Sequence, residues 1–164
     1  MIAAALLPLV MMAQTKIGVV NSQELFDLMP EKAAAEAKLK ALSDKYHAEY
    51  ELLQREFDKK YADYQTVAAD ASMPETIKER RVQELQESDK KLREFERRAA
   101  DDIAAQRKAL TQPIIDRIQE VIRTAGKQSN LDLVLDTAVT PVAYTGPNTI
   151  DLTPMVKALL GLEF

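Results

Sequence analysis

The apolar and polar positions of the chain divide it into one short strand, a long helical region and a C-terminal segment of short strands. Residues 16–20 (KIGVV) have the character of a strand, and about 110 residues follow before the next strand pattern. Asn21 is predicted to cap a short helix, because Glu24 completes a capping box three residues later. An isolated strand leaves backbone groups unpaired, so its partners are expected within residues 131–152.

The intervening residues predict an antiparallel helical hairpin that covers residues 30–126, with its tip near residues 69–75. Pro30 suits the first position of a helix, and no Gly or Pro follows until Pro74. A second helix is predicted from residue 75 to about residue 125, with Gly126 as its C-terminal cap. Long helices joined by a short connection pair with each other by default.

The first helix carries a heptad pattern, which predicts one narrow apolar seam. The predicted seam uses positions 39, 43, 46, 50, 53, 57, 60, 64 and 67, and all but Ser43 and Lys60 are apolar or aromatic. The second helix instead has apolar residues eleven apart, for example Leu92, Ile103 and Ile114, which favours a straighter helix. Pro113 is predicted to kink the second helix.

After Gly126 the pattern changes to short strands. Residues 131–136 (LDLVLD) alternate as in a half-buried strand, and residues 141–144 and 149–152 are further strand candidates. Thr153 is predicted to cap a last helix. The fold class is therefore α+β, with a small sheet body, residues 14–29 and 127–164, and a hairpin inserted after its first strand. So small a sheet cannot bury a stable core alone, which favours oligomerisation.

Charge and composition fit an arm that stands in water. Residues 31–125 contain 19 Lys and Arg and 20 Asp and Glu, so the hairpin is nearly neutral but densely charged. The whole chain has a net charge of −4 and no cysteine, which argues against nucleic-acid binding and excludes disulfides and thiolate metal sites. Residues 1–13 form an uncharged apolar run that predicts export by a signal peptide, although an atypical or truncated one, because no Lys or Arg precedes the run. A buried N-terminal helix is the competing interpretation.

The order of these features resembles the Skp (OmpH) family of periplasmic chaperones for outer-membrane proteins. The resemblance rests on KIGVVNSQELF (residues 16–26), the helix entry at Pro30, the charged hairpin, LDLVLD and residues 150–153. It implies a homotrimer of jellyfish-like shape, in which strands of three chains build a body and three arms enclose unfolded clients without ATP. Family members are strongly basic whereas this chain is acidic, so no lipopolysaccharide site is carried over.

Catalytic chemistry is not indicated. A single histidine, His47, lies among helical residues and is interpreted as solvated. Adjacent carboxylates such as Asp101 and Asp102 do not face each other on a helix and are also interpreted as solvating. The sequence predicts no enzyme activity, no cofactor and no metal.

Two sets of residues are candidates for binding. The body residues expected to build the oligomer are Ile17, Val19, Leu131, Leu133 and Leu135. The candidate client contacts on the arm are Tyr61, Met73, Arg80, Arg81, Lys90, Lys91, Arg97 and Arg98. Pairing with neighbouring acidic residues is the competing interpretation of the basic ones.

The favoured function is that of a periplasmic holdase for unfolded outer-membrane proteins. The alternative is a structural coiled-coil spacer of the envelope that binds a folded partner. A spacer would need a continuous Leu and Ile seam, whereas the seam of this chain uses Tyr and Ala.

Overall fold

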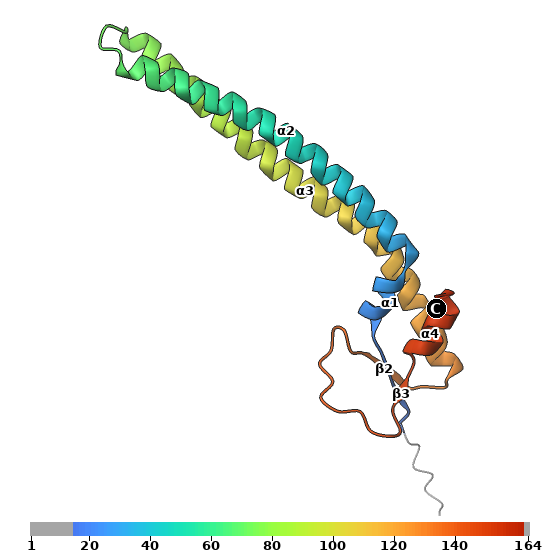
Figure 1. Ribbon diagram of the computed structural model, residues 1–164. Helices are drawn as coiled ribbons and strands as arrows, with labels where there is room; N and C mark the ends of the chain where they lie inside the picture. The colour runs from blue at the N-terminus through green and yellow to red at the C-terminus, as the bar shows by residue number, and fades with distance from the viewer. Residues whose placement is uncertain (1–14, 163–164) are drawn as a thin grey trace, which may run out of the picture. The chain divides into compact units, whose positions relative to one another are not determined.

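The structure is a computed structural model that describes residues 15–162, and the predicted signal peptide at residues 1–13 lies outside them. The α+β class predicted from the sequence is confirmed. The elements are β1 (Ile17–Val20), α1 (Ser22–Leu28), α2 (Pro30–Ala69), α3 (Glu75–Gln128), β2 (Leu133–Asp136), β3 (Ile150–Asp151) and α4 (Thr153–Leu160) (Figure 1).

The chain forms two compact units. The arm unit is residues 30–113, and the body unit is the described residues up to Met29 together with those from Ile114 onward. The sequence analysis placed the end of the arm at residue 126, but α3 from Ile114 onward belongs to the body unit. The reason is packing, because Ile114, Ile118 and Ala125 are buried in the core of the body. α3 remains helical through Pro113.

The sheet has the order β2-β1-β3, and β1 is parallel to both neighbours. Ile17 pairs with Leu133 and Val19 with Leu135, while Gly18 pairs with Ile150. The partners of β1 therefore come from residues 131–152, as the sequence predicted. The connection from β1 to β2 contains α1 and the inserted hairpin, which consists of α2 and α3.

The two faces of the sheet differ in burial. Gly18 and Val20 on β1 are buried, whereas Ile17 and Val19 between them are only half-buried. Val20 joins a core built mainly from α1, the end of α3 and α4. The members of this core are Val20, Leu25, Met29, Ile114, Ile118, Ala125, Leu152, Val156 and Leu160. The opposite face of β1 and β2, called here the outer sheet face, carries Ile17, Val19, Leu133 and Leu135.

The structure contains less strand than the sequence predicted, both at residues 141–144 and at the start of β2. Residues 141–144 form no strand, and the segment 137–149 has turns and irregular backbone instead. Pro141 and Pro147 lack the N–H that a strand needs for pairing, which explains the irregular course. Leu131, which the sequence predicted as the first strand residue, lies two residues before β2. Its N–H donates to the carbonyl of Gly126 at 3.0 Å and therefore belongs to the C-terminal cap of α3.

Gly126 does not cap the helix, contrary to the sequence prediction. α3 runs to Gln128, and Asn130 adopts the left-handed conformation, with φ of 50°. The N–H of Asn130 donates to the carbonyl of Lys127, which together with the bond from Leu131 to Gly126 forms a Schellman motif. A Cβ at Gly126 would lie 3.2 Å from Cγ2 of Val134, so this glycine serves helix–strand packing.

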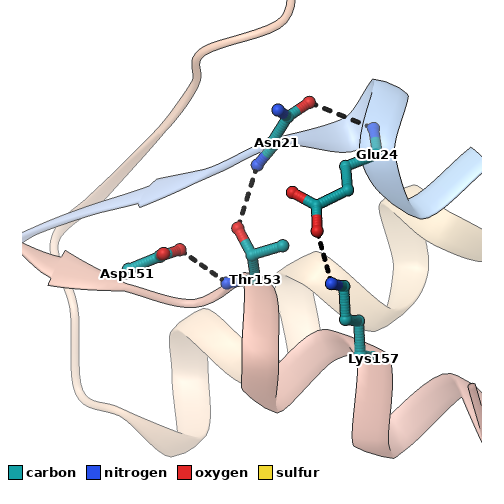
Figure 2. Close-up of polar contacts among 5 residues, drawn as sticks. All are labelled: Asn21, Glu24, Asp151, Thr153 and Lys157. Carbon is teal, nitrogen blue, oxygen red and sulfur yellow. Dashed lines mark hydrogen bonds and ion pairs between the residues drawn. The ribbon is translucent and has the colours of Figure 1, made fainter. Parts of the chain in front are cut away.

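A small polar network joins the start of α1 to the start of α4 (Figure 2). The Asn21 side chain accepts from the N–H of Glu24 at 3.1 Å, so Asn21 is the N-cap as predicted, but the Glu24 side chain does not complete a capping box. The N–H of Asn21 donates to the hydroxyl of Thr153 at 3.2 Å, and Glu24 pairs with Lys157. Thr153 was predicted to cap α4, but it is the first helical residue, and Asp151 accepts from its N–H at 2.8 Å.

Replacing the buried Thr153 by Val is expected to destabilise the body unit by about 1 kcal/mol, because the partly buried N–H of Asn21 loses its acceptor. Thr153→Ser keeps the hydroxyl and serves as the control. Thermal unfolding followed by circular dichroism measures both variants. Equal melting temperatures of the two variants would contradict the assigned role of the hydroxyl.

The tip of the hairpin is a short turn stabilised by Asp70. α2 ends at Ala69, and the Asp70 carboxylate accepts from the N–H of Ser72 at 2.8 Å and from its hydroxyl at 2.6 Å. These hydrogen bonds lower the pKa of Asp70, the hydroxyl bond contributing most. The turn therefore lies within the predicted tip, residues 69–75.

Candidate functional site

The seam of the arm unit follows the predicted heptad with one substitution. Every predicted position on α2 is at least partly buried except Ser43, which is exposed, and Leu42 is partly buried instead. Facing it, α3 buries Ser88, Leu92, Phe95 and Ala99, which are spaced by four, three and four. The eleven-residue spacing predicted for α3 also agrees with the burial, because Leu92 and Ile114 are buried and Ile103 is partly buried.

Tyr46 is the main polar contact across the seam. Its hydroxyl donates to the Asp102 carboxylate at 2.8 Å, and its ring meets Phe95 edge-on at 5.8 Å between centroids. The sequence analysis interpreted Asp102 as solvating, which is wrong. The hydrogen bond to Asp102 is the largest cause of a raised Tyr46 pKa, and burial adds to it. Tyr50 also has a raised pKa, of which the Glu96 carboxylate is the largest cause, while its hydroxyl donates to Oε1 of Gln54 at 3.3 Å.

The raised Tyr46 pKa can be measured by alkaline titration of tyrosinate absorbance. The hydrogen bond stabilises the arm while Tyr46 is protonated, and this contribution is lost as the pH rises through the raised pKa. Tyr46→Phe is expected to remove signal from the late part of the titration. Asp102→Asn, which keeps Tyr46 but removes the charged acceptor, is expected to shift that signal to lower pH. A Tyr46→Phe titration that loses only early signal would contradict the assignment.

Most of the candidate basic residues take part in ion pairs within the arm. The pairs, with their shortest distances, are Arg80–Glu84 (3.4 Å), Arg81–Glu84 (2.6 Å), Lys90–Glu94 (3.9 Å) and Lys91–Glu56 (3.9 Å). Arg98 donates to the backbone carbonyl of Glu94 at 3.2 Å, and Arg97 has no ion pair among residues 15–162. Pairing therefore accounts for four of the six, and Arg97 and Arg98 keep a charge without a carboxylate partner.

The two apolar candidates near the tip differ in exposure. Tyr61 is 47% exposed and stacks on Phe57, with ring centroids 6.4 Å apart and an interplanar angle of 10°. Met73 lies in the tip turn and is partly buried. Tyr61 is therefore the more exposed of the two and presents an aromatic ring to solvent.

Four of the five candidate body residues share one surface. Ile17, Val19, Leu133 and Leu135 lie together on the outer sheet face, and Leu133 is 46% exposed. Leu131 does not join them, because it packs against the core of its own body unit beside Gly18.

The segment 137–149 exposes apolar residues that are not among the binding candidates predicted from the sequence. Val139 is 76% exposed and Tyr144 is 81% exposed. The segment contains no Asp, Glu, Lys or Arg, unlike the arm. The absence of charged residues around Pro141 and Pro147 is the signal in the sequence that could have identified this exposed segment, of which residues 141–144 were predicted as a strand.

The described residues offer no centre for metal chemistry. No group of three or more potential metal ligands occurs among residues 15–162. His47 is exposed and lies 3.4 Å from Glu51, one helical turn away. None of the helices in the described part is long and apolar enough to cross a membrane.

The architecture defines a small parallel sheet body with a helical hairpin inserted between β1 and β2. The family model described as Outer membrane protein (OmpH-like) matches residues 16–160. The chain therefore belongs to the OmpH-like (Skp) family, as the resemblance predicted, and this membership supports a chaperone role rather than an enzymatic one.

A solved structure has the same fold. It is a candidate outer membrane chaperone (OmpH-like) from Caulobacter crescentus CB15, and the TM-score is 0.66 at 16% sequence identity. The alignment covers 90% of this chain and 85% of that chain. No curated protein matches this chain.

Proposed function

We propose that this chain is an ATP-independent holdase of the periplasm, which binds unfolded outer-membrane proteins between helical arms and prevents their aggregation. The observation that carries the proposal is the arm, a hairpin of the 40-residue α2 and of α3 up to Pro113, in a chain of the OmpH-like family. A narrow seam with solvated faces suits an arm that surrounds a client.

The clients would be held by many weak contacts rather than by one deep site. Tyr61 and Met73 supply apolar contacts near the tip, and the proposed polar contacts are Arg80, Arg81, Lys90, Lys91, Arg97 and Arg98. Because most of these cations already have carboxylate partners, each contributes little affinity alone. Several such contacts within one cavity give useful affinity through a high effective concentration, and the client can still leave.

The proposed assembly is a homotrimer joined through the body units. The outer sheet face presents four apolar side chains. Every copy of the chain carries the same face, so contact between the body units of several copies would bury apolar surface from each of them. Joining three small sheets would bury this face and protect strand edges, which a sheet of three short strands cannot do alone. The three arms would then enclose one cavity.

Lipopolysaccharide is left out of the proposed partners. The chain has a net charge of −4, and four of the candidate cations are already paired. An anionic lipid surface attracts clusters of unpaired Lys and Arg. Unfolded protein is therefore the better partner.

The proposal is tested by mixing the purified protein with a urea-unfolded outer-membrane β-barrel protein, without nucleotide, and measuring mass during size-exclusion chromatography. We expect one co-eluting complex that contains an intact assembly and one unfolded client. The same β-barrel protein, already folded in detergent, is expected to elute separately. Binding of folded protein alone would instead support the spacer function, and binding of neither would refute the holdase.

A further inference from the structure

The seam of the arm is interrupted by a cluster of partly buried charges. Lys60 on α2 and Arg81 on α3 occupy heptad positions that would normally be apolar, and Glu84 lies beside them. The side chains of Lys60, Arg81 and Glu84 are 34%, 33% and 33% exposed. Glu56, Lys60, Arg81 and Glu84 are called here the charged layer.

The contacts within the charged layer leave it incompletely satisfied. Arg81 bonds to Glu84 at 2.6 Å, and Lys60 pairs with Glu56 at 3.0 Å. Nε of Arg81 is buried and has no hydrogen-bond partner among the described residues. Arg81 is the main cause of the lowered pKa of Glu84, with Arg80 and Lys60 adding to it, so the carboxylate is charged at neutral pH.

Packing differs on the two sides of this layer. On one side, the main seam (residues 39–57 against 88–102) contains the buried residues Ser88, Leu92, Phe95 and Ala99. On the other side, the tip segment (residues 61–83) contains no buried residue. An open hollow of about 580 Å³ lies along the tip segment, lined by residues that include Tyr64, Ala68, Lys78, Glu79, Val82 and Gln86.

Charged side chains at seam positions lose part of their hydration, which costs free energy. Their mutual attraction offsets this cost only when every charged group is well paired. The orphaned Nε of Arg81 shows that pairing is incomplete here. The loosely packed tip segment adds little apolar stabilisation of its own. Local opening occurs where few buried apolar contacts hold the helices together.

We propose that the charged layer is a breakpoint at which the tip segment opens and closes independently of the main seam. Opening uncovers the seam side chains Tyr64, Val67 and Val82 at the end of the arm. The two helices would then separate in the tip segment while they remain paired along the main seam. This inference concerns the arm itself and holds whether or not the arm binds unfolded clients.

The inference is tested by hydrogen exchange with mass spectrometry on the full chain at neutral pH. Glu84→Gln leaves Arg81 and Lys60 without this carboxylate, so exchange in residues 61–83 is expected to become about threefold faster or more. Exchange in residues 88–102 is expected to stay unchanged. Glu87→Gln is the matched control, because Glu87 is exposed on the same helix and has no ion pair among residues 15–162.

A second variant tests the opposite direction. Lys60→Leu, Arg81→Leu and Glu84→Gln together put leucine at the two charged seam positions and remove the charge of Glu84, while Glu56 keeps its contact with Lys91, and tip exchange is expected to become about tenfold slower. Salt of about 1 M, which shortens the Debye length to about 3 Å, should accelerate tip exchange in the original chain but not in the triple variant. The inference is overturned if the triple variant's tip exchanges at the original rate, or if Glu84→Gln accelerates the main seam equally.

Discussion

Leu133→Asp is expected to dissociate the proposed trimer into monomers whose arms remain helical. Leu133 is 46% exposed in the single chain, so the body unit can tolerate the carboxylate. In its own chain this position lies beside Ile17 and Val19 on the outer sheet face. In the proposed assembly a second copy would cover this face, so the new carboxylate would be buried against apolar side chains. Burying one unpaired charge costs about 3–5 kcal/mol for each interface.

Sedimentation velocity measures the mass of this variant, and circular dichroism measures its helix content. Leu52→Asp is the control, because Leu52 is 61% exposed on the arm and lies outside the body. Val19→Asp is a less clean test, since Val19 pairs with Asp151 on β3 and a new carboxylate would face an existing one within the sheet. An unchanged mass of Leu133→Asp would show that the outer sheet face is not the assembly surface.

Phe95→Ala is expected to have the converse effect, loosening the arm while the assembly persists. Phe95 is only 7% exposed and supplies the edge-on contact with Tyr46. Removing a buried phenylalanine costs about 3–5 kcal/mol, of which part is the cavity left behind. The loss falls on the arm unit, because Phe95 lies within residues 30–113.

Hydrogen exchange of residues 39–57 and 88–102 measures the loosening, and sedimentation measures the assembly. Leu52→Ala, which truncates an exposed residue of α2, is the control and should leave exchange nearly unchanged. If Phe95→Ala left the exchange rates at the level of that control, Phe95 would not be the anchor of the main seam.

The sequence predicted the elements that depend on local signals. Helices α2 and α3 follow from long runs without Gly or Pro, and the starts at Asn21 and Pro30 follow from capping chemistry. The heptad on α2 correctly located the seam because its period is a local property. The one wrong position is Ser43, which is exposed. The seam runs through Leu42 instead, because Leu42, Tyr46 and Tyr50 follow each other in two steps of four residues rather than in the alternating steps of a heptad.

The features that the sequence did not predict depend on tertiary neighbours. A glycine after a long helical run usually marks the C-terminal cap, but Gly126 lies within α3 and packs closely on Val134. Asn130 adopts the left-handed conformation that ends the helix. The parallel register of three strands of four residues or fewer is not encoded in any local pattern. Residues 141–144 had strand composition, but no described strand pairs with them.

The contacts within the arm required the register of the hairpin. Tyr46 reaches Asp102, and Glu56 reaches Lys91, so the two numbers of a facing pair sum to nearly the same value. This register places Lys60 opposite residues 87 and 88, about one helical turn from Glu84, so a cluster of charges around this heptad exception could have been predicted. Without it, Lys60 was only an exception to the heptad and Asp102 only a solvated acid.

Suppression of aggregation tests the central claim, that the chain is a holdase, most directly. A urea-unfolded outer-membrane β-barrel protein is diluted into buffer with the purified protein, without nucleotide, and light scattering is followed. One assembly per client is expected to abolish most of the scattering, and Leu133→Asp, which cannot enclose a cavity, is expected to protect poorly. Scattering that rises as fast with the stoichiometric assembly as without it would contradict the holdase function.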